Sequence, residues 1–271
     1  MSIIGNIMAK LQTPSAKSAR LLTVKEAHRL TPNMVRVTFA GEALRGIPAG
    51  REGGNCKILI PSVGQSREAF AAQLLDGPKP VTRTYTVRHI RSDALELDVD
   101  FVAHGDEGPA SAWAARAKPG SFCGFRGPST AKVEKFAADW YLVAADMSAI
   151  PVAAATLEAM PREATGTAIF EITSEADKQA IDAPAGVDVH WLVHDDPHRP
   201  STAQVDFVRQ MTWRPGRVQT CIAGESSVIR AFRTLLHNEK GLPKADTYIS
   251  GYWKIGLVED QHQAMKRAEA A

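Results

Sequence analysis

The segment of this 271-residue chain with the clearest chemical potential is Arg83-Thr84-Tyr85-Thr86-Val87-Arg88. Alternate side chains of a β-strand share a face, so Arg83 and Tyr85 are expected on one side and Thr86 on the other. A guanidinium suits a phosphate, a phenol ring offers an aromatic plane, and a threonine offers a hydroxyl to a ring edge. The segment can therefore hold a flat, phosphate-bearing group, although an ordinary half-exposed strand has the same pattern.

A second segment ends one strand and opens one helix. Asp100-Phe101-Val102-Ala103-His104-Gly105 ends the expected strand, and Gly108-Pro109-Ala110-Ser111 opens the expected helix. Free backbone N–H groups and the positive end of the helix dipole make such an opening an anion site. A well-capped helix without a ligand is the alternative interpretation.

Two turns in the second half carry weaker signals. Asp146-Met147-Ser148-Ala149-Ile150-Pro151 lies where nicotinamide-binding domains usually carry glycines, and it contains none. Ser148 is expected either to face a ligand or to cap the following helix. Gly224-Glu225 opens a later helix, and its glutamate would repel a nearby phosphate. Arg230 and Arg233 on that helix either bind a nucleotide or form a solvated face.

Three histidines, His190, His194 and His198, recur at intervals of four residues. Pro197 would break a helix there, and residues 187–193 have the pattern of a strand, so the three rings do not share one face. We therefore expect no dedicated metal site.

The elements that position these residues change in character along the chain. Short alternating apolar runs with Gly and Pro between them predict an antiparallel β-barrel in the first half. Its strands are expected at 20–24, 34–40, 57–60, 84–88, 95–102 and 121–125. Residues 62–80 are interpreted as a surface connection with a helical turn at 68–75.

From about residue 139, nearly continuous apolar strands alternate with helices, which predicts a parallel sheet covered on both faces. Strands are expected at 141–145, 167–172, 187–193, 219–223 and 247–250. Helices are expected at 148–160, 202–210 and 226–238, with a further helical segment before residue 187. The predicted domains are 1–130 and 138–254, followed by a tail, 255–271, that can form a helix.

Composition limits the classes of function. Lys and Arg total 32 against 30 Asp and Glu, so no global basic field favours nucleic acid, and any anion site must be local. Three widely spaced cysteines form neither a disulfide framework nor a metal motif, which indicates a reducing compartment. No window approaches the ~20 apolar residues of a membrane span, and the start has no leader pattern. A cytoplasmic monomer is expected.

Taken in order, five motifs resemble the siderophore-interacting proteins, flavin-dependent ferric-siderophore reductases of the ferredoxin-reductase superfamily. The resemblance covers nearly the whole chain. It rests on the segments 83–88, 100–114, 145–151, Ala223-Gly224-Glu225 with its basic helix, and Gly251-Tyr252-Trp253-Lys254-Ile255-Gly256. It implies an FAD-binding antiparallel β-barrel followed by an NAD(P)-binding-like α/β domain with a parallel sheet.

The resemblance also implies roles for individual residues. Arg83 would pair with phosphate, Tyr85 would lie against the isoalloxazine, and Thr86 would reach the ring near its reactive nitrogen. The other candidates for contact with the flavin, its pyrophosphate or the incoming donor are Val102, His104, Ala110, Ser111, Asp146, Ser148 and Ala149. For His104, a structural role at the strand end is the alternative.

The implied reaction passes electrons from NAD(P)H or reduced ferredoxin through FAD to a ferric siderophore and releases Fe(II). The flavin performs this chemistry, so no catalytic side chain is expected. A bulky, often anionic chelate needs a locally basic mouth, for which the candidates are Lys57, Arg126 and Lys254. Trp253 would either cover the flavin or anchor the last strand.

Two other functions remain open from the sequence. One is a general NAD(P)H:flavin or ferredoxin-type reductase whose acceptor is not a siderophore. The other is a siderophore-binding protein without turnover, in which the basic residues would hold the chelate.

Overall fold

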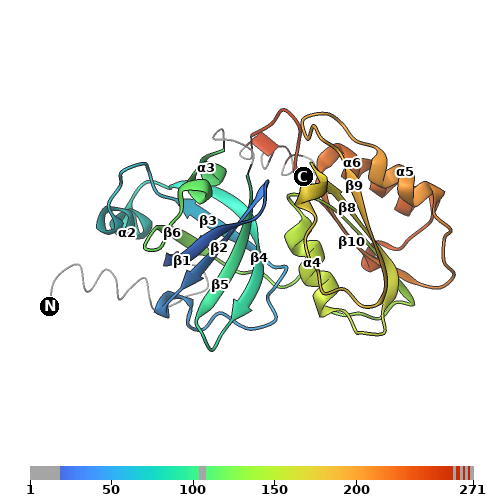
Figure 1. The fold of residues 1–271 in the computed structure, drawn as a ribbon, viewed down its shortest axis with the longest axis horizontal. Helices are drawn as coiled ribbons and strands as arrows, with labels where there is room; N and C mark the ends of the chain where they lie inside the picture. The colour runs from blue at the N-terminus through green and yellow to red at the C-terminus, as the bar shows by residue number, and fades with distance from the viewer. Residues whose placement is uncertain (1–18, 104–107, 259–260, 263–264, 266–267, 269–271) are drawn as a thin grey trace. The chain divides into compact units, whose positions relative to one another are not determined.

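The computed structural model describes residues 19–103, 108–258, 261–262, 265 and 268 (Figure 1). It divides into two compact units, Met1–Ala131 and Lys132–Ala271. Each unit is described below by itself. Within the described part of the chain, no helix has the length and apolar character needed to cross a membrane.

The first unit is a closed antiparallel barrel with the strand order β1-β2-β5-β4-β3-β6. Its strands are β1 (Arg20–Thr31), β2 (Met34–Ala40), β3 (Asn55–Ile60), β4 (Val81–Arg91), β5 (Glu96–Val102) and β6 (Phe122–Arg126). The predicted barrel is therefore confirmed. β1 and β4 are longer than expected, because β1 pairs with β2 as far as Thr31 and β4 pairs with β5 as far as Arg91.

The barrel core follows from the alternation in the strands. Every second residue of β2, namely Val35, Val37 and Phe39, is buried in it. The short helix α3 (Pro109–Arg116) packs on this core through Ala110 and Ala114. The segment that carries the predicted anion-binding turn is thus fixed to the barrel by the apolar side of its own helix.

The helical turn expected at 68–75 is one residue longer at each end in the structure and belongs to a packed element instead of a simple surface connection. A ten-residue helix, α2 (Arg67–Asp76), begins after Ser66, whose hydroxyl accepts from the N–H of Ala69 at 3.2 Å. Phe70 is fully buried against Leu21 and Leu59. The N-cap at Ser66 and the burial of the Phe70 ring therefore stabilise α2 and attach it to the barrel.

The second unit is a parallel sheet with the strand order β11-β10-β7-β8-β9. Its strands are β7 (Trp140–Asp146), β8 (Thr165–Ile172), β9 (Gly186–Val193), β10 (Val218–Glu225) and β11 (Thr247–Trp253). Its α-helices are α4 (Ile150–Ala159), α5 (Ala203–Gln210) and α6 (Ser226–Arg233). The predicted parallel sheet is confirmed.

Helices cover both faces of this sheet. α5 and α6 share one apolar cluster with the sheet face that includes Leu142 and Ile222. α4 packs on the other face, where Thr156 contacts Cys221. β7 lies at the centre, with β8 on one side and β10 on the other, so the strand order reverses between β7 and β10.

Three expectations for the second unit need correction. The helical segment expected before residue 187 is one 3-10 turn, Glu175–Asp177, where the buried Asp177 accepts from the hydroxyls of Thr173 and Ser174. The last strand continues to Trp253 instead of ending at 250. The helix expected at 226–238 is α-helical only to Arg233 and continues as a π-helix over Thr234–Glu239.

Candidate functional site

The side chains of the candidate residues on β4 alternate between the two faces of the strand, as the sequence pattern predicted. Arg83 pairs with Ile58 and Tyr85 with Cys56, and both β3 partners belong to the barrel core. Thr86 points the other way and is buried. Arg83 is half-buried, and its guanidinium donates to the carbonyl of Thr82 at 3.0 Å.

Tyr85 is held by a series of aromatic rings. Its ring centroid lies 4.3 Å from that of Phe101 on β5, at an interplanar angle of 44°. Phe101 in turn lies 5.9 Å from Trp113 on α3. Tyr85 is half-buried at the border of the core, so packing fixes its plane while part of the side chain stays accessible.

The first turn of α3 has the features of an anion-binding helix start. Gly108 is the N-cap and has no side chain to accept from the first turn, and proline follows at the helix start. Ala110 and Ser111 are buried there. Such a turn presents backbone N–H groups at the positive end of the dipole. Val102 ends β5 and is half-buried, whereas His104 lies outside the described residues.

Two of the three basic candidates are neighbours on the barrel. Lys57 on β3 pairs directly with Arg126 on β6 and with Thr84 on β4. The Lys57 ammonium donates to the Thr84 hydroxyl, and Arg126 is exposed. Directly paired residues share a face, so the strand register brings two positive charges together. The third candidate, Lys254, belongs to the second unit, where its ammonium lies 3.4 Å from Met265 Sδ.

The outer face of β2, β5 and β4 carries a charged network that the sequence did not reveal. Asp100 accepts two hydrogen bonds from Arg36, at 2.7 and 2.8 Å. Asp98 accepts hydrogen bonds from Arg91 and from the hydroxyl of Thr38. Its Oδ2 also lies 3.0 Å from Nδ1 of His89. Both aspartates are buried.

Two opposing effects, burial and hydrogen bonding, act on the pKa of Asp98. Burial acts to raise this pKa, but the hydrogen bonds from Arg91, His89 and Thr38 outweigh burial and hold it well below its usual range. Asp98 therefore stays ionised and fastens three strands of the barrel wall. The signal for this network in the sequence was the alternation of acidic residues in β5, with Arg36 and Thr38 on β2, and it did not identify the partners.

In the second unit, Asp146 is a buried centre of hydrogen bonds. Its Oδ1 accepts from the N–H of Ser148 at 2.9 Å and from the Ser148 hydroxyl at 2.6 Å. Its Oδ2 accepts from the N–H of Glu225 at 2.8 Å and from the indole N–H of Trp253 at 2.7 Å. Burial raises the pKa of Asp146, although these four bonds favour the carboxylate. The ends of β7, β10 and β11 thus meet on one side chain.

The same contacts correct the interpretation of Ser148 as a helix cap. The N-cap of α4 is Ala149, which makes no side-chain cap, and the Ser148 hydroxyl is taken by Asp146 instead. Ala149 is fully buried. Trp253 anchors the end of β11 through its indole, which was one of its two expected roles.

Glu225 caps its own helix. Its Oε2 accepts from the N–H groups of Ser227 at 2.6 Å and Val228 at 3.3 Å, at the start of α6. Its Oε1 accepts from the N–H of Ile255 at 3.3 Å. Glu225 is buried, so this carboxylate joins the start of α6 to the turn that follows β11.

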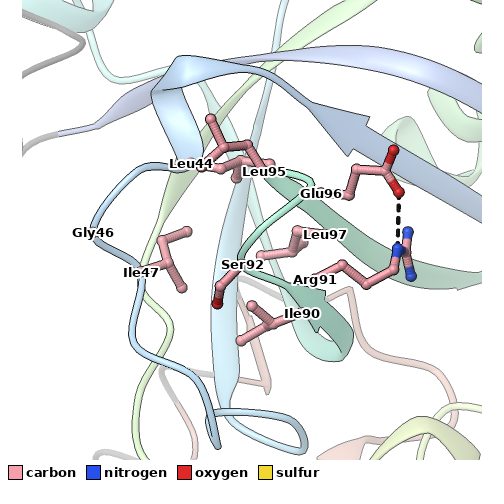
Figure 2. Close-up of a pocket in the computed structure, with 9 residues that line it drawn as sticks. All are labelled: Leu44, Gly46, Ile47, Ile90, Arg91, Ser92, Leu95, Glu96 and Leu97. Atoms are coloured by element: carbon pink, nitrogen blue, oxygen red, sulfur yellow. Dashed lines mark hydrogen bonds and ion pairs between the residues drawn. The ribbon is translucent and has the colours of Figure 1, made fainter.

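A hollow on the barrel lies apart from all predicted site residues (Figure 2). Its lining is mainly aliphatic and includes Leu44, Ile47, Ile90, Leu95 and Leu97. Its charged residues, Arg91 and Glu96, bond to each other at 2.8 Å. This hollow presents no set of polar groups that converge on a ligand.

The described residues include side chains of the types that hold metal ions, among them three cysteine thiols. There, no three His, Cys, Asp or Glu side chains form a group that could hold a metal ion. Cys56, Cys123 and Cys221 are free and buried, and burial raises the pKa of Cys56 to about 12 and that of Cys221 to about 11. Thiols held this far from ionisation are poor nucleophiles.

Comparison with known proteins places both units in one family. Residues 23–132 match the model of the siderophore-interacting FAD-binding domain, and residues 138–256 match the model of the siderophore-interacting protein.

Individual relatives agree with these matches. Ferric vibriobactin reductase ViuB of Vibrio cholerae is 33% identical over 252 residues, which cover 90% of this chain and 92% of ViuB. The NADPH-dependent ferric-chelate reductase of Escherichia coli is 29% identical over 193 residues, which cover 65% of this chain and 72% of that protein. The crystal structure of the siderophore-interacting protein SipS from Aeromonas hydrophila superposes with a TM-score of 0.82 at 29% identity, covering 95% of this chain and all of SipS.

Proposed function

Because this chain belongs to the siderophore-interacting protein family, we propose that it reduces ferric siderophores with electrons that its FAD receives from NAD(P)H or reduced ferredoxin. The named activities of the ViuB and Escherichia coli relatives, ferric vibriobactin reductase and ferric-chelate reductase, support the reaction class. The observation that carries the proposal is the arrangement of Tyr85, Phe101 and the uncapped start of α3.

The barrel residues fit FAD in three respects. Tyr85 is a half-buried ring whose plane is fixed by Phe101. The first turn of α3, with Ala110 and Ser111, suits a pyrophosphate because its glycine N-cap offers no competing side chain. Arg83 on the same strand as Tyr85 provides a guanidinium for phosphate. Val102 at the end of β5, Thr86 and His104 complete the proposed flavin contacts.

In the proposed mechanism, the protein binds and orients while the cofactor supplies electron transfer. Bound FAD can accept two electrons from a nicotinamide and pass them singly to Fe(III). Tyr85 would lie against the ring and set its plane, and Thr86 would offer its hydroxyl or N–H to the ring edge. Hard oxygen ligands hold Fe(III) better than Fe(II), so reduction labilises the iron in its chelate.

The proposed acceptor site uses positive charge. Lys57 and Arg126 are cross-strand partners on one face of the barrel, and Lys254 follows β11 in the second unit. The Lys57–Arg126 pair attracts a negatively charged chelate even though the net charge of the chain is only +2, and Lys254 is proposed as a further cation for the chelate. Asp146, Ser148 and Ala149 are the proposed neighbours of the donor or flavin.

The proposal includes a monomer that acts in the cytoplasm. The three free, buried cysteines support a reducing compartment, since none is engaged in a disulfide.

The test is a pair of measurements on the purified protein. The preparation should be yellow and retain FAD, and reduction by NADH, NADPH and reduced ferredoxin should be followed in parallel without oxygen. The reduced protein is then mixed with ferric siderophore and a chromogenic Fe(II) chelator. Fe(II) release supports the proposal. A folded protein that takes up no FAD overturns it, as does a reduced flavoprotein that yields no Fe(II).

The same experiment separates the other two functions. A general reductase would pass electrons to free flavin or ferredoxin and leave the ferric siderophore unreduced. A binding protein without turnover would bind the chelate and show no Fe(II) with any donor.

A further inference from the structure

The carboxyl edge of the second unit has a switch point between β7 and β10, where the strand order reverses. In open α/β sheets, ligands bind in the crevice at such a point, and pyrophosphates use the N–H groups of the helix starts beside it. β7 ends at Asp146 and β10 ends at Glu225. Two carboxylates therefore end the two strands that would border a dinucleotide.

The turn after β7 already has an internal acceptor. The N–H of Ser148 donates to Asp146 Oδ1 at 2.9 Å, and the N–H of Glu225 donates to Oδ2 at 2.8 Å. Gly224 packs so closely that a Cβ there would lie 2.6 Å from Asp146 Oδ2. Asp146 thus fills the space between the two strand ends and uses the N–H groups that face it.

The start of α6 also has an internal acceptor. Glu225 accepts from the N–H groups of Ser227 and Val228, which are the donors that a phosphate would need at this helix. Its second oxygen is held by the N–H of Ile255. The carboxylate therefore lies at the positive end of the α6 dipole.

A third carboxylate adds negative charge to this edge. Glu171 on β8 pairs in register with Asp146. Burial, with the charge of Asp146 as a lesser cause, raises the pKa of Glu171. Negative charge is thus already crowded where a dinucleotide phosphate would add more.

We infer that Glu225 and Asp146 are specificity-determining residues that close the β7/β10 switch point to the pyrophosphate of a donor. This inference rests on the proposed function, because it concerns how the donor is selected. A nicotinamide donor then keeps its pyrophosphate away from the starts of α4 and α6. A protein donor that brings no pyrophosphate is unaffected by these two carboxylates.

The test measures binding of inorganic pyrophosphate and ADP-ribose to the oxidised, FAD-loaded protein by calorimetry. Glu225→Ser removes the charge and keeps a short side chain that caps helices well. It should bind both probes about tenfold or more tightly than the unaltered protein, because a juxtaposed like charge is a strong barrier to an anion. Glu225→Gln keeps the size of the side chain and should show a smaller gain.

Glu163→Ser is the matched control. Glu163 is an exposed carboxylate between α4 and β8, at the amino edge of the same sheet. The Glu163→Ser variant should bind the probes as the unaltered protein does. Added salt should reduce the gain in probe affinity of the Glu225 variants.

Two outcomes would overturn the inference. Either both Glu225 variants bind the probes no better than the unaltered protein, or Glu163→Ser produces the same gain as the Glu225 variants. Failure of the proposed function is recognised separately, as missing FAD or as no Fe(II) from protein reduced with dithionite, and neither readout depends on binding of the two probes to the second unit.

Discussion

Trp253 donates its indole N–H to the carboxylate of Asp146, which joins two residues 107 positions apart at the carboxyl edge of one sheet. The same carboxylate receives three further hydrogen bonds, from Ser148 and from the N–H of Glu225. The end of β11 is thus tied to the end of β7, the first strand of the second unit, by one buried side chain.

Asp146→Asn should destabilise the second unit, because an amide nitrogen cannot accept from the donors that face Asp146. Leaving buried donors without acceptors costs about 1–3 kcal/mol each, so we expect a loss of roughly 2–4 kcal/mol. Urea unfolding followed by tryptophan fluorescence measures it. Trp253→Phe removes one of the four donors and should cost less. Equal stability of Asp146→Asn and the unaltered protein would contradict the central role of Asp146.

Arg83→Ala should weaken retention of FAD. Hydrogen bonds to charged groups contribute about 1.5–3 kcal/mol, which corresponds to roughly a ten- to 150-fold loss of FAD affinity. Flavin fluorescence during dialysis or titration measures the dissociation. Arg45→Ala is the control, because Arg45 is an exposed arginine of the same unit that pairs only locally with Glu42. Unchanged FAD affinity in Arg83→Ala would remove Arg83 from the site.

Removing charge from the pair Lys57 and Arg126 should impair use of an anionic ferric chelate. Lys57→Ala with Arg126→Ala is expected to raise KM several-fold and to reduce the dependence of the rate on ionic strength, since steering by exposed charges is screened by salt. Stopped-flow oxidation of the reduced protein measures both effects. Lys118→Ala, at an exposed lysine of the same unit, should change neither. An unaltered salt dependence in the double variant would exclude the pair from the acceptor site.

Asp98 should contribute a pH-dependent part of the barrel's stability. Its pKa in the folded chain is held below the unfolded value of about 3.9, so its contribution is present above about pH 4 and is lost as the pH falls further. Asp98→Asn should lower the free energy of unfolding by about 2 kcal/mol at pH 7, because it leaves Arg91 without this partner.

The measurement is urea unfolding of both proteins at a series of pH values. The difference between Asp98→Asn and the unaltered protein should shrink below pH 4. Asp93→Asn, at an exposed carboxylate in the β4–β5 turn, is the control. A difference that stays constant down to pH 2 would show that the charge of Asp98 is not what stabilises the network.

Local sequence pattern was sufficient for most of the fold. β2 has the bounds that the alternation of Val35, Val37 and Phe39 predicted, because one buried face forces that period. The extent of α2 was predicted to within one residue, but its packing was not, since the burial of Phe70 against β1 and β3 is a contact that no local window reveals.

For the candidate site too, some features could be predicted from the sequence and others could not. The pairing of Lys57 with Arg126 depends on the register between β3 and β6, which the sequence did not specify. The sequence did indicate that Glu225 would disfavour a phosphate. That its carboxylate turns back to cap α6 depends on contacts with Ile255, thirty positions away, and needed the structure.

The closed barrel has a consequence for ligand selection. β3 is hydrogen-bonded on both sides, to β4 and β6, and its side chains alternate between the core and the outside. A slip of one residue would turn Lys57 into the core and expose Cys56. The backbone positions from which Lys57 and Arg126 extend are therefore fixed by the hydrogen-bond ladder itself. If these residues form the proposed acceptor site, a chelate would have to match that spacing with the separation of its own negative groups.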